Sequence, residues 1–189
     1  CRPEMLRQFG LMGSVYMKRI LGVPNPRVGL VNIGVEETKG TELQVEAYGL
    51  MKEAGYNFIG NVEAREVPLG GCDVAVCDGF TGNVIIKFGE GLGELLKSQF
   101  KEEYIHHTLP KIGLFFMWPA MKRVMGRFDW EKYGGSPVLG VNGSVVKVHG
   151  RSKANAIAHA ITGAANFIER NGVDRIREEI ARGVQNGND

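Results

Sequence analysis

Residues suited to binding a phosphate-like anion follow an apolar run in the middle of the sequence. In the segment DVAVCDGFTGNVIIK the apolar residues end at an aspartate, and glycines and small polar residues come next. This order is typical of a buried strand, a glycine turn and a helix start, where free N–H groups favour an anion. The alternative is that these residues only cap the helix and turn the chain. The candidates are Asp78, Gly79, Thr81, Gly82 and Asn83.

Two earlier apolar runs also lead into an asparagine. The run RVGLV is followed by Asn32, and the run NFIG is followed by Asn61. In a parallel sheet joined by right-handed crossovers, the carboxyl ends of the strands share one edge, and ligands collect there. We therefore expect Asn32, Asn61 and Asp78 to converge, which favours a binding site over simple capping.

The loop VEETKG, which follows the first of these strands, carries charged residues. Lys39 precedes a predicted helix and is suited to attract an anion. Glu36 and Glu37 would orient this lysine or simply favour the positive end of the helix. We include Glu37 and Lys39 as site candidates, and a plain surface role remains the alternative.

A similar turn occurs late in the chain. A predicted strand ends at His149, and Gly150, Arg151 and Ser152 lead into a helix. Arg151 and Ser152 stand where a phosphate could be held. His149 is either a ligand contact or, as is commoner for a lone histidine at a strand end, merely hydrogen-bonded.

Hydrophobic periodicity predicts the elements that position these residues. The predicted helices span residues 3–21, 41–54, 83–103 and 153–169. Gly13, inside the first helix, is interpreted as a point of close packing. An Asn142-Gly143 pair between apolar runs 138–141 and 144–149 predicts a β-hairpin with a tight turn. Strands alternating with helices predict an α/β fold with a mostly parallel sheet.

The segment LPKIGLFFMWPAMKRVMGRF is rich in aromatic residues and methionine, and all its charges are basic. Pro119 would divide it into two short helices or a helical hairpin, and we place a protruding hairpin at residues 104–132. Aromatic residues beside basic ones suit an anionic bilayer surface, but they are also enriched in subunit interfaces. The residues concerned are Leu114, Phe115, Phe116, Trp118, Lys122 and Arg123.

Composition narrows the remaining possibilities. A net charge of +2 gives no argument for a nucleic acid partner. Three cysteines without a C-x-x-C pair suggest neither a disulfide framework nor a zinc site, so we predict no metal and no cofactor. No GxGxxG fingerprint follows a strand, which disfavours a dehydrogenase. The chain opens on Cys1 and a helical pattern, so we expect an upstream part to be missing.

Four motifs in this chain together resemble the PlsX family of phosphate acyltransferases of bacterial phospholipid synthesis. They are NIGVEETKG, NFIGNVEAR, DGFTGNVIIK, and YGGSPVLGVNG followed by KVHG. The match runs in order from residue 1 to about 177, and residues 1–189 resemble the C-terminal part of a single domain. After His149 the family usually has two serines and an acidic residue, where this chain has Arg151, Ser152 and Lys153.

The resemblance implies a three-layer α/β/α sandwich similar to phosphotransacetylases and the isocitrate dehydrogenase group. It implies a homodimer that associates peripherally with the inner face of the cytoplasmic membrane. It also implies that inorganic phosphate attacks acyl-acyl carrier protein, and that the acyl phosphate passes to a glycerol-phosphate acyltransferase. The alternatives are a phosphotransacetylase acting on acyl-CoA and a non-catalytic, membrane-docked scaffold.

Our hypothesis for the mechanism is direct displacement without a covalent enzyme intermediate. Helix starts near Lys39, Thr81 and Ser152 would hold phosphate, while an asparagine such as Asn83 or a backbone amide stabilises the oxyanion. Asp78 would orient these donors or accept a proton from phosphate.

Overall fold

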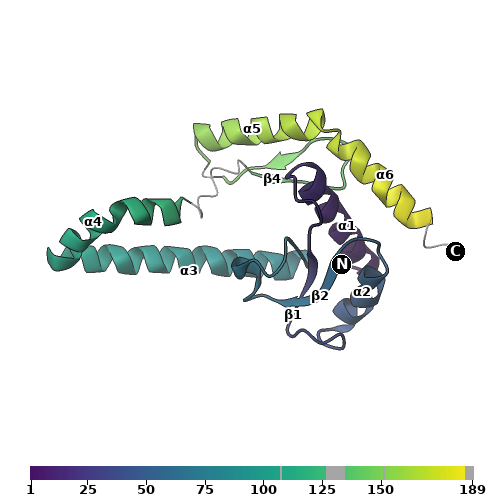
Figure 1. The fold of residues 1–189 in the computed structure, drawn as a ribbon, viewed down its shortest axis with the longest axis horizontal. Coiled ribbons are helices and arrows are strands. Elements are labelled where there is room, and N and C mark those ends of the chain that lie inside the picture. Colours follow the sequence, from purple (N-terminus) through teal and green to yellow (C-terminus); the bar gives the residue numbers. More distant parts are fainter. Residues whose placement is uncertain (107, 127–134, 151, 186–189) are drawn as a thin grey trace.

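A three-stranded parallel sheet forms the centre of the fold (Figure 1). The computed structural model describes residues 1–106, 108–126, 135–150 and 152–185. The strand order is β2-β1-β3, with β1 at Val28–Asn32, β2 at Phe58–Glu63 and β3 at Val74–Val76. Every residue of the central strand β1 is buried, as its continuous apolar sequence predicts. The α/β class and the parallel sheet are confirmed, and the arrangement is consistent with a three-layer α/β/α fold.

Helices α1 (Pro3–Arg19) and α2 (Glu42–Lys52) pack against the sheet. The core between them consists of Leu6, Val28, Leu30, Ala47, Met51 and Val76. Helix α1 lies very close to β3, since a Cβ atom at Gly13 would stand 2.5 Å from Val74 Cγ1. The interpretation of Gly13 as a point of close packing is therefore confirmed.

Strand β2 contains one more residue than its partner β1. Val28 pairs with Phe58, but Leu30 pairs with Asn61, and Gly60 between them has φ +90°. This is a β-bulge of the kind that re-aims a side chain. Our prediction that the strand ends before Asn61 is wrong, because beyond the bulge β2 continues to Glu63, which pairs with Asn32.

A long helical arm follows β3. Helix α3 covers Gly79–His106, and α4 covers Thr108–Met125 beside it; together they extend away from the sheet (Figure 1). Pro119 lies inside α4 and does not divide it into two helices; α4 packs along α3, and these contacts offset the hydrogen bond that the proline removes. Of the hairpin that we placed at residues 104–132, residue 107 and residues 127–132 lie outside the described part. No described helix has the length and apolar character to span a bilayer.

The C-terminal part contains a small antiparallel pair and two helices. Strand β4 (Ser136–Pro137) pairs with β5 (Val146–Lys147), and α5 (Ala154–Glu169) and α6 (Gly172–Gln185) follow. The predicted hairpin pairing is present, but its arms are shorter and residues 138–145 form a wide loop. The tight Asn142-Gly143 turn is therefore wrong, because Leu139 packs into a second apolar cluster beside α1 and holds the loop open.

A short 3-10 helix, η1 (Val67–Leu69), connects β2 to β3, as expected for a link of about a dozen residues.

Opposite the candidate edge, Arg27 joins the start of β1 to the segment that leads into β3. Its guanidinium donates to both carboxylate oxygens of Asp73, at 3.0 and 3.1 Å, and to the carbonyls of Gly70 and Gly71. This clamp aligns the two strands at their amino ends.

Candidate functional site

The carboxyl ends of the three parallel strands form one edge, and the polar residues that follow them meet there. Leu30 pairs with Asn61 on one side and with Val76 on the other, so the strands reach the edge together. Asn32 ends β1, and Asp78 follows β3 by two residues. The structure thus brings Asn32, Asn61 and Asp78 to the same edge, although Asn61 lies inside its strand rather than at its end.

The Asn32 side chain fastens the loop that follows β1, residues 33–40. Its Nδ2 donates to the Lys39 carbonyl at 2.8 Å, and its Oδ1 accepts from the Ile33 N–H at 2.8 Å. Gly40 at φ +96° lies directly against it, where a Cβ atom would stand 2.5 Å from Oδ1. Asn32 is buried and acts on the loop backbone, so its position favours a supporting role over direct substrate contact.

The Asn61 side chain fastens the same loop at a second point. Its Nδ2 donates to the Glu36 carbonyl at 2.7 Å. Its Oδ1 is buried, and no described residue donates a hydrogen bond to it. Only 6% of Asn61 is exposed, so this orphaned acceptor has no contact with bulk water. Because Asn61 is buried and its Nδ2 holds the loop backbone, its position favours a supporting role over donation to an oxyanion.

Lys39 presents its charge at this edge. A Cβ atom at Gly34 would stand 3.2 Å from Lys39 Cγ, so the lysine stem lies against the backbone just beyond β1. The side chain is exposed, and no carboxylate of the described residues forms an ion pair with it. A cation without an internal partner, on a loop tied to two strands, is suited to bind an anion.

Glu37 faces away from this edge, toward α2. Its Oε1 accepts hydrogen bonds from the Lys52 ammonium and the Tyr48 hydroxyl, each at 3.1 Å. These two donors, Lys52 first, lower the pKa of Glu37. Sequence reasoning missed Tyr48 and Lys52; their i, i+4 spacing, which puts both on one helix face, was the available signal.

Asp78 caps α3. Its carboxylate accepts from the Thr81 N–H at 2.9 Å and from the Thr81 hydroxyl at 2.8 Å. These bonds, the backbone donor first, lower the pKa of Asp78. The capping interpretation therefore describes Asp78 and Thr81 correctly. Because a carboxylate already occupies this helix start and stays ionised, it is a weak proton acceptor there.

The remaining candidates in α3 lie in its first turns. Asn83 is exposed, and its amide makes no hydrogen bond to another described residue, so both of its polar atoms are available. Gly82 lies over Cys77, where a Cβ atom would stand 3.1 Å from Sγ. Gly79 has open space around it, so a larger residue would also fit at this position.

His149 and Ser152 lie elsewhere, because β5 belongs to the small antiparallel pair and not to the parallel sheet. In the view of Figure 1, α3 begins at the sheet, and the start of α5 lies above the middle part of α3, away from that beginning. Lys87 and, to a lesser degree, His149 lower the pKa of Glu90 on α3. Ser152 Oγ is buried without a described partner, and the N-cap residue Lys153 makes no side-chain capping bond. Arg151 lies outside the described residues.

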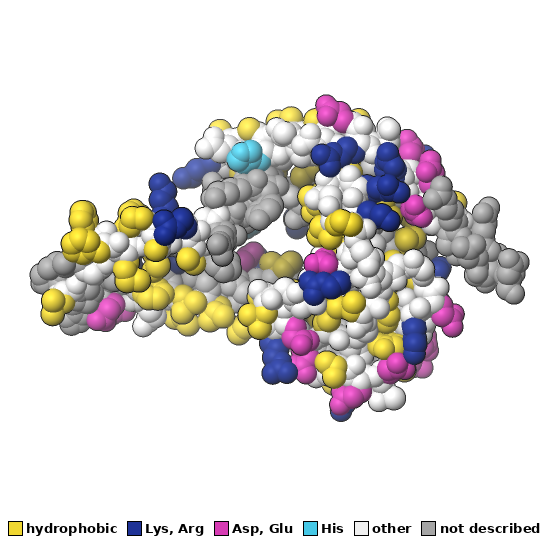
Figure 2. All heavy atoms as spheres, in the orientation of Figure 1, with side chains coloured by type: hydrophobic (Ala, Val, Ile, Leu, Met, Phe, Trp, Pro, Cys, Tyr) yellow, Lys and Arg dark blue, Asp and Glu magenta, His cyan; other side chains and the backbone are white. Residues whose placement is uncertain are grey.

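Apolar side chains are exposed along the arm, as the hydrophobic spheres over α3 and α4 in Figure 2 show. Phe115 and Phe116 are 77% and 76% exposed, and their rings meet edge to face. Trp118 is exposed beside them, Leu114 is half-buried, and Lys122 and Arg123 are exposed in the last turn of α4. The aromatic and basic residues thus share one accessible helix.

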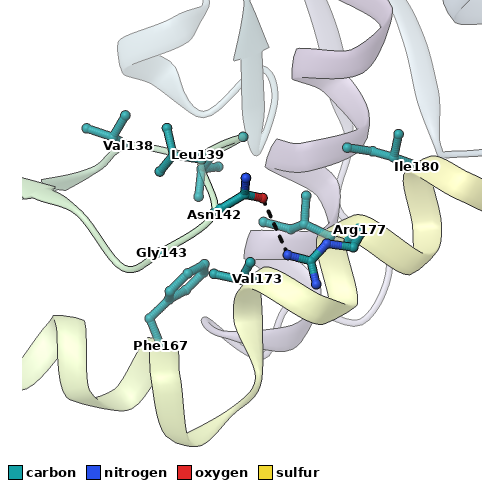
Figure 3. Close-up of a pocket in the computed structure, with 11 residues that line it drawn as sticks. Val138, Leu139, Asn142, Gly143, Phe167, Val173, Arg177 and Ile180 are labelled. Carbon is teal, nitrogen blue, oxygen red and sulfur yellow. Dashed lines mark hydrogen bonds between the residues drawn. The ribbon is translucent and has the colours of Figure 1, made fainter.

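Sequence reasoning did not identify a cavity of about 140 Å³ between the 138–145 loop, α5 and α6 (Figure 3). Its lining is mainly apolar and includes Val138, Leu139, Phe167, Val173 and Ile180. Arg177 reaches across its mouth, 3.4 Å from Asn142 Oδ1 and 2.7 Å from Asp174. Arg177 is thus already paired with Asp174 at the surface, and the other lining residues carry no charge. It adjoins the apolar cluster beside α1 and is not lined by residues of the sheet edge.

Comparison with known proteins gives one consistent family. The family model described as "Fatty acid synthesis protein" matches residues 1–175. A "Phosphate acyltransferase" of Alkaliphilus oremlandii is 48% identical over 97% of this chain and 54% of its own length. Relatives of the same name from Heliobacterium modesticaldum and Clostridium tetani are 46% and 47% identical over 97% and 95% of the chain, and over 55% and 54% of their own lengths. The chain thus spans about half the length of these relatives.

Proposed function

The chain belongs to the fatty acid synthesis protein family, that of the PlsX phosphate acyltransferases, and from this premise we propose that it transfers a fatty acyl group from acyl-acyl carrier protein to inorganic phosphate. The product would be an acyl phosphate for phospholipid synthesis. The observation that carries the proposal is the exposed Lys39 side chain, on a loop whose backbone is tied to Asn32 at the sheet edge, with no ion pair to a carboxylate of the described residues. Acyl transfer to phosphate is also what the names of the relatives describe.

Phosphate would bind to Lys39 and to the exposed amide of Asn83. The Asp78 carboxylate already accepts from the Thr81 N–H and places a negative charge at the α3 start, so this helix end offers little to a second anion. A lysine supplies a point charge with three donors, which suits a phosphate oxygen. Ser152, two residues before α5, would make a separate contribution away from this edge, and Arg151 stays a candidate from the sequence alone.

The reaction would be a direct displacement. An oxygen of hydrogen phosphate attacks the thioester carbonyl carbon, and the new C–O bond produces a tetrahedral oxyanion. Collapse of this intermediate breaks the C–S bond, and the thiolate takes up the proton that hydrogen phosphate brought. Asn83 would donate to the oxyanion. Asp78 would act by orienting α3 through Thr81, since its lowered pKa argues against a role as proton acceptor.

The arm would provide the contact with other partners. Exposed Phe115, Phe116 and Trp118 beside Lys122 and Arg123 favour insertion at the anionic inner face of the cytoplasmic membrane. The same exposed residues are suited to homodimer formation or to docking an acidic carrier protein. A position at the membrane would deliver the acyl phosphate to a glycerol-phosphate acyltransferase.

The decisive assay measures phosphate-dependent thiol release from acyl-acyl carrier protein, with the acyl phosphate trapped by hydroxylamine. The proposal predicts release that rises with phosphate and a matching amount of trapped acyl group. Faster release from acyl-CoA would indicate a phosphotransacetylase. Absence of release from both donors would indicate a scaffold and contradict the proposal.

A further inference from the structure

The turn that carries Lys39 is fastened to the sheet at both of its ends. Residues 36–39 form a β-turn closed by a hydrogen bond from the Lys39 N–H to the Glu36 carbonyl at 3.1 Å. The Glu36 carbonyl also accepts from Asn61 Nδ2, and the Lys39 carbonyl accepts from Asn32 Nδ2. Two strand residues therefore hold the first and last carbonyls of the turn.

The second residue of the turn is fastened from the opposite side, by α2. Tyr48 and Lys52 both donate to Glu37 Oε1, and the Lys52 ammonium lies 6.0 Å from the centre of the Tyr48 ring. Tyr48 is itself fixed, because its ring packs edge-on against Phe58 of β2 with centroids 5.1 Å apart. The attachment point on α2 is thus part of the core.

We propose that Glu37, Tyr48 and Lys52 form a latch that fixes the rotation of the 36–39 turn and so positions the Lys39 ammonium at the sheet edge. A turn held only at its two end carbonyls can still rotate about the line that joins them. A third attachment, at its second residue, removes that freedom. The inference rests on the proposed function to the extent that Lys39 is taken to bind phosphate.

Positioning and simple electrostatics predict opposite results when the Glu37 charge is removed. Loss of a negative charge two residues from Lys39 would by itself favour a phosphate anion and lower its KM. Loss of the latch raises that KM, because the lysine is no longer held in place. Glu37→Gln separates the two effects, since its amide oxygen still accepts from Tyr48 and Lys52 without a charge.

The kinetic test compares the phosphate KM and kcat of the purified protein with those of Glu37→Ala and Glu37→Gln. Glu37→Ala should raise KM about three- to tenfold and leave kcat within about twofold, the size expected for exposed hydrogen bonds. Glu37→Gln should give a KM at or slightly below that of the parent, because it keeps both hydrogen bonds and loses only the charge. Lys87→Met is the control for loss of an exposed lysine–glutamate pair elsewhere, because Lys87 is about as exposed as Lys52 and is also paired with a glutamate. An unchanged or lower KM in Glu37→Ala would overturn the proposal.

Hydrogen exchange gives a readout that needs no activity. The Lys39 N–H donates to the Glu36 carbonyl and the Ile33 N–H donates to Asn32 Oδ1. Both amide protons should exchange about three- to tenfold faster in Glu37→Ala than in the parent, measured without substrate. Glu37→Gln and Lys87→Met should not accelerate this exchange. Faster exchange in a protein that fails to transfer acyl groups to phosphate would support the latch and reject the proposed function. Unchanged exchange in Glu37→Ala would reject the latch whatever the activity.

Discussion

The two buried asparagines of the sheet edge should respond differently to the same substitution. Asn32 has both amide atoms engaged, whereas Asn61 has one hydrogen bond and one buried oxygen without a described partner. Asn32→Leu removes two hydrogen bonds, each worth about 1 kcal/mol, so it should lower the free energy of unfolding by about 2 kcal/mol. Asn61→Leu removes one hydrogen bond worth about 1 kcal/mol of stability. It also removes the buried, unpaired Oδ1, whose burial costs about 1–3 kcal/mol.

The net change for Asn61→Leu should therefore lie between zero and about 2 kcal/mol of stabilisation. Denaturation in urea measures both variants, provided that the slope of the unfolding free energy against denaturant is unchanged. The reasoning would be refuted if Asn61→Leu were as destabilising as Asn32→Leu, because that would mean that the Asn61 oxygen has a partner in solution.

Three further predictions concern charge, chemistry and the arm. The Arg27 guanidinium lowers the folded-state pKa of Asp73. Their pair therefore stabilises the protein above the unfolded pKa of about 4, and this contribution disappears as pH falls through the folded pKa. Asp73→Asn should flatten the pH dependence of the unfolding free energy in acid, and an unchanged slope would exclude the pair as its source. Asn83→Ala should reduce turnover by about 10² to 10³ if its amide stabilises the oxyanion, and a loss of only a few-fold would remove it from the site. Phe115→Glu should abolish co-sedimentation with anionic vesicles and spare acyl transfer measured without membranes, whereas loss of both would indicate a structural role.

The sheet edge could be predicted from the sequence because it depends on short, contiguous patterns along the chain. Apolar runs that end in Asn32 and Asp78, separated by helical patterns, are sufficient to place both residues on one edge of a parallel sheet. The bulge in β2 also had a signal, a glycine inside a strand, but glycine alone does not say which way Asn61 then points.

The features that sequence reasoning missed depend on tertiary contacts. The Glu37 carboxylate turns to α2 because Tyr48 and Lys52 lie there, which the loop motif does not reveal. The Asn142-Gly143 turn opens because the core beside α1 takes up Leu139. His149 was a candidate ligand contact because it lies between a predicted strand and a glycine turn, yet β5, which precedes it, belongs to a different sheet.

The most direct test of the phosphate site is the phosphate dependence of acyl transfer in Lys39→Met. An ammonium about 4 Å from a phosphate oxygen contributes on the order of 1–3 kcal/mol at an exposed edge, which corresponds to about 5- to 150-fold in KM. We expect the phosphate KM to rise by that factor while the KM for the acyl donor stays within about twofold. A phosphate KM equal to that of the parent would contradict the assignment of this edge as the phosphate site.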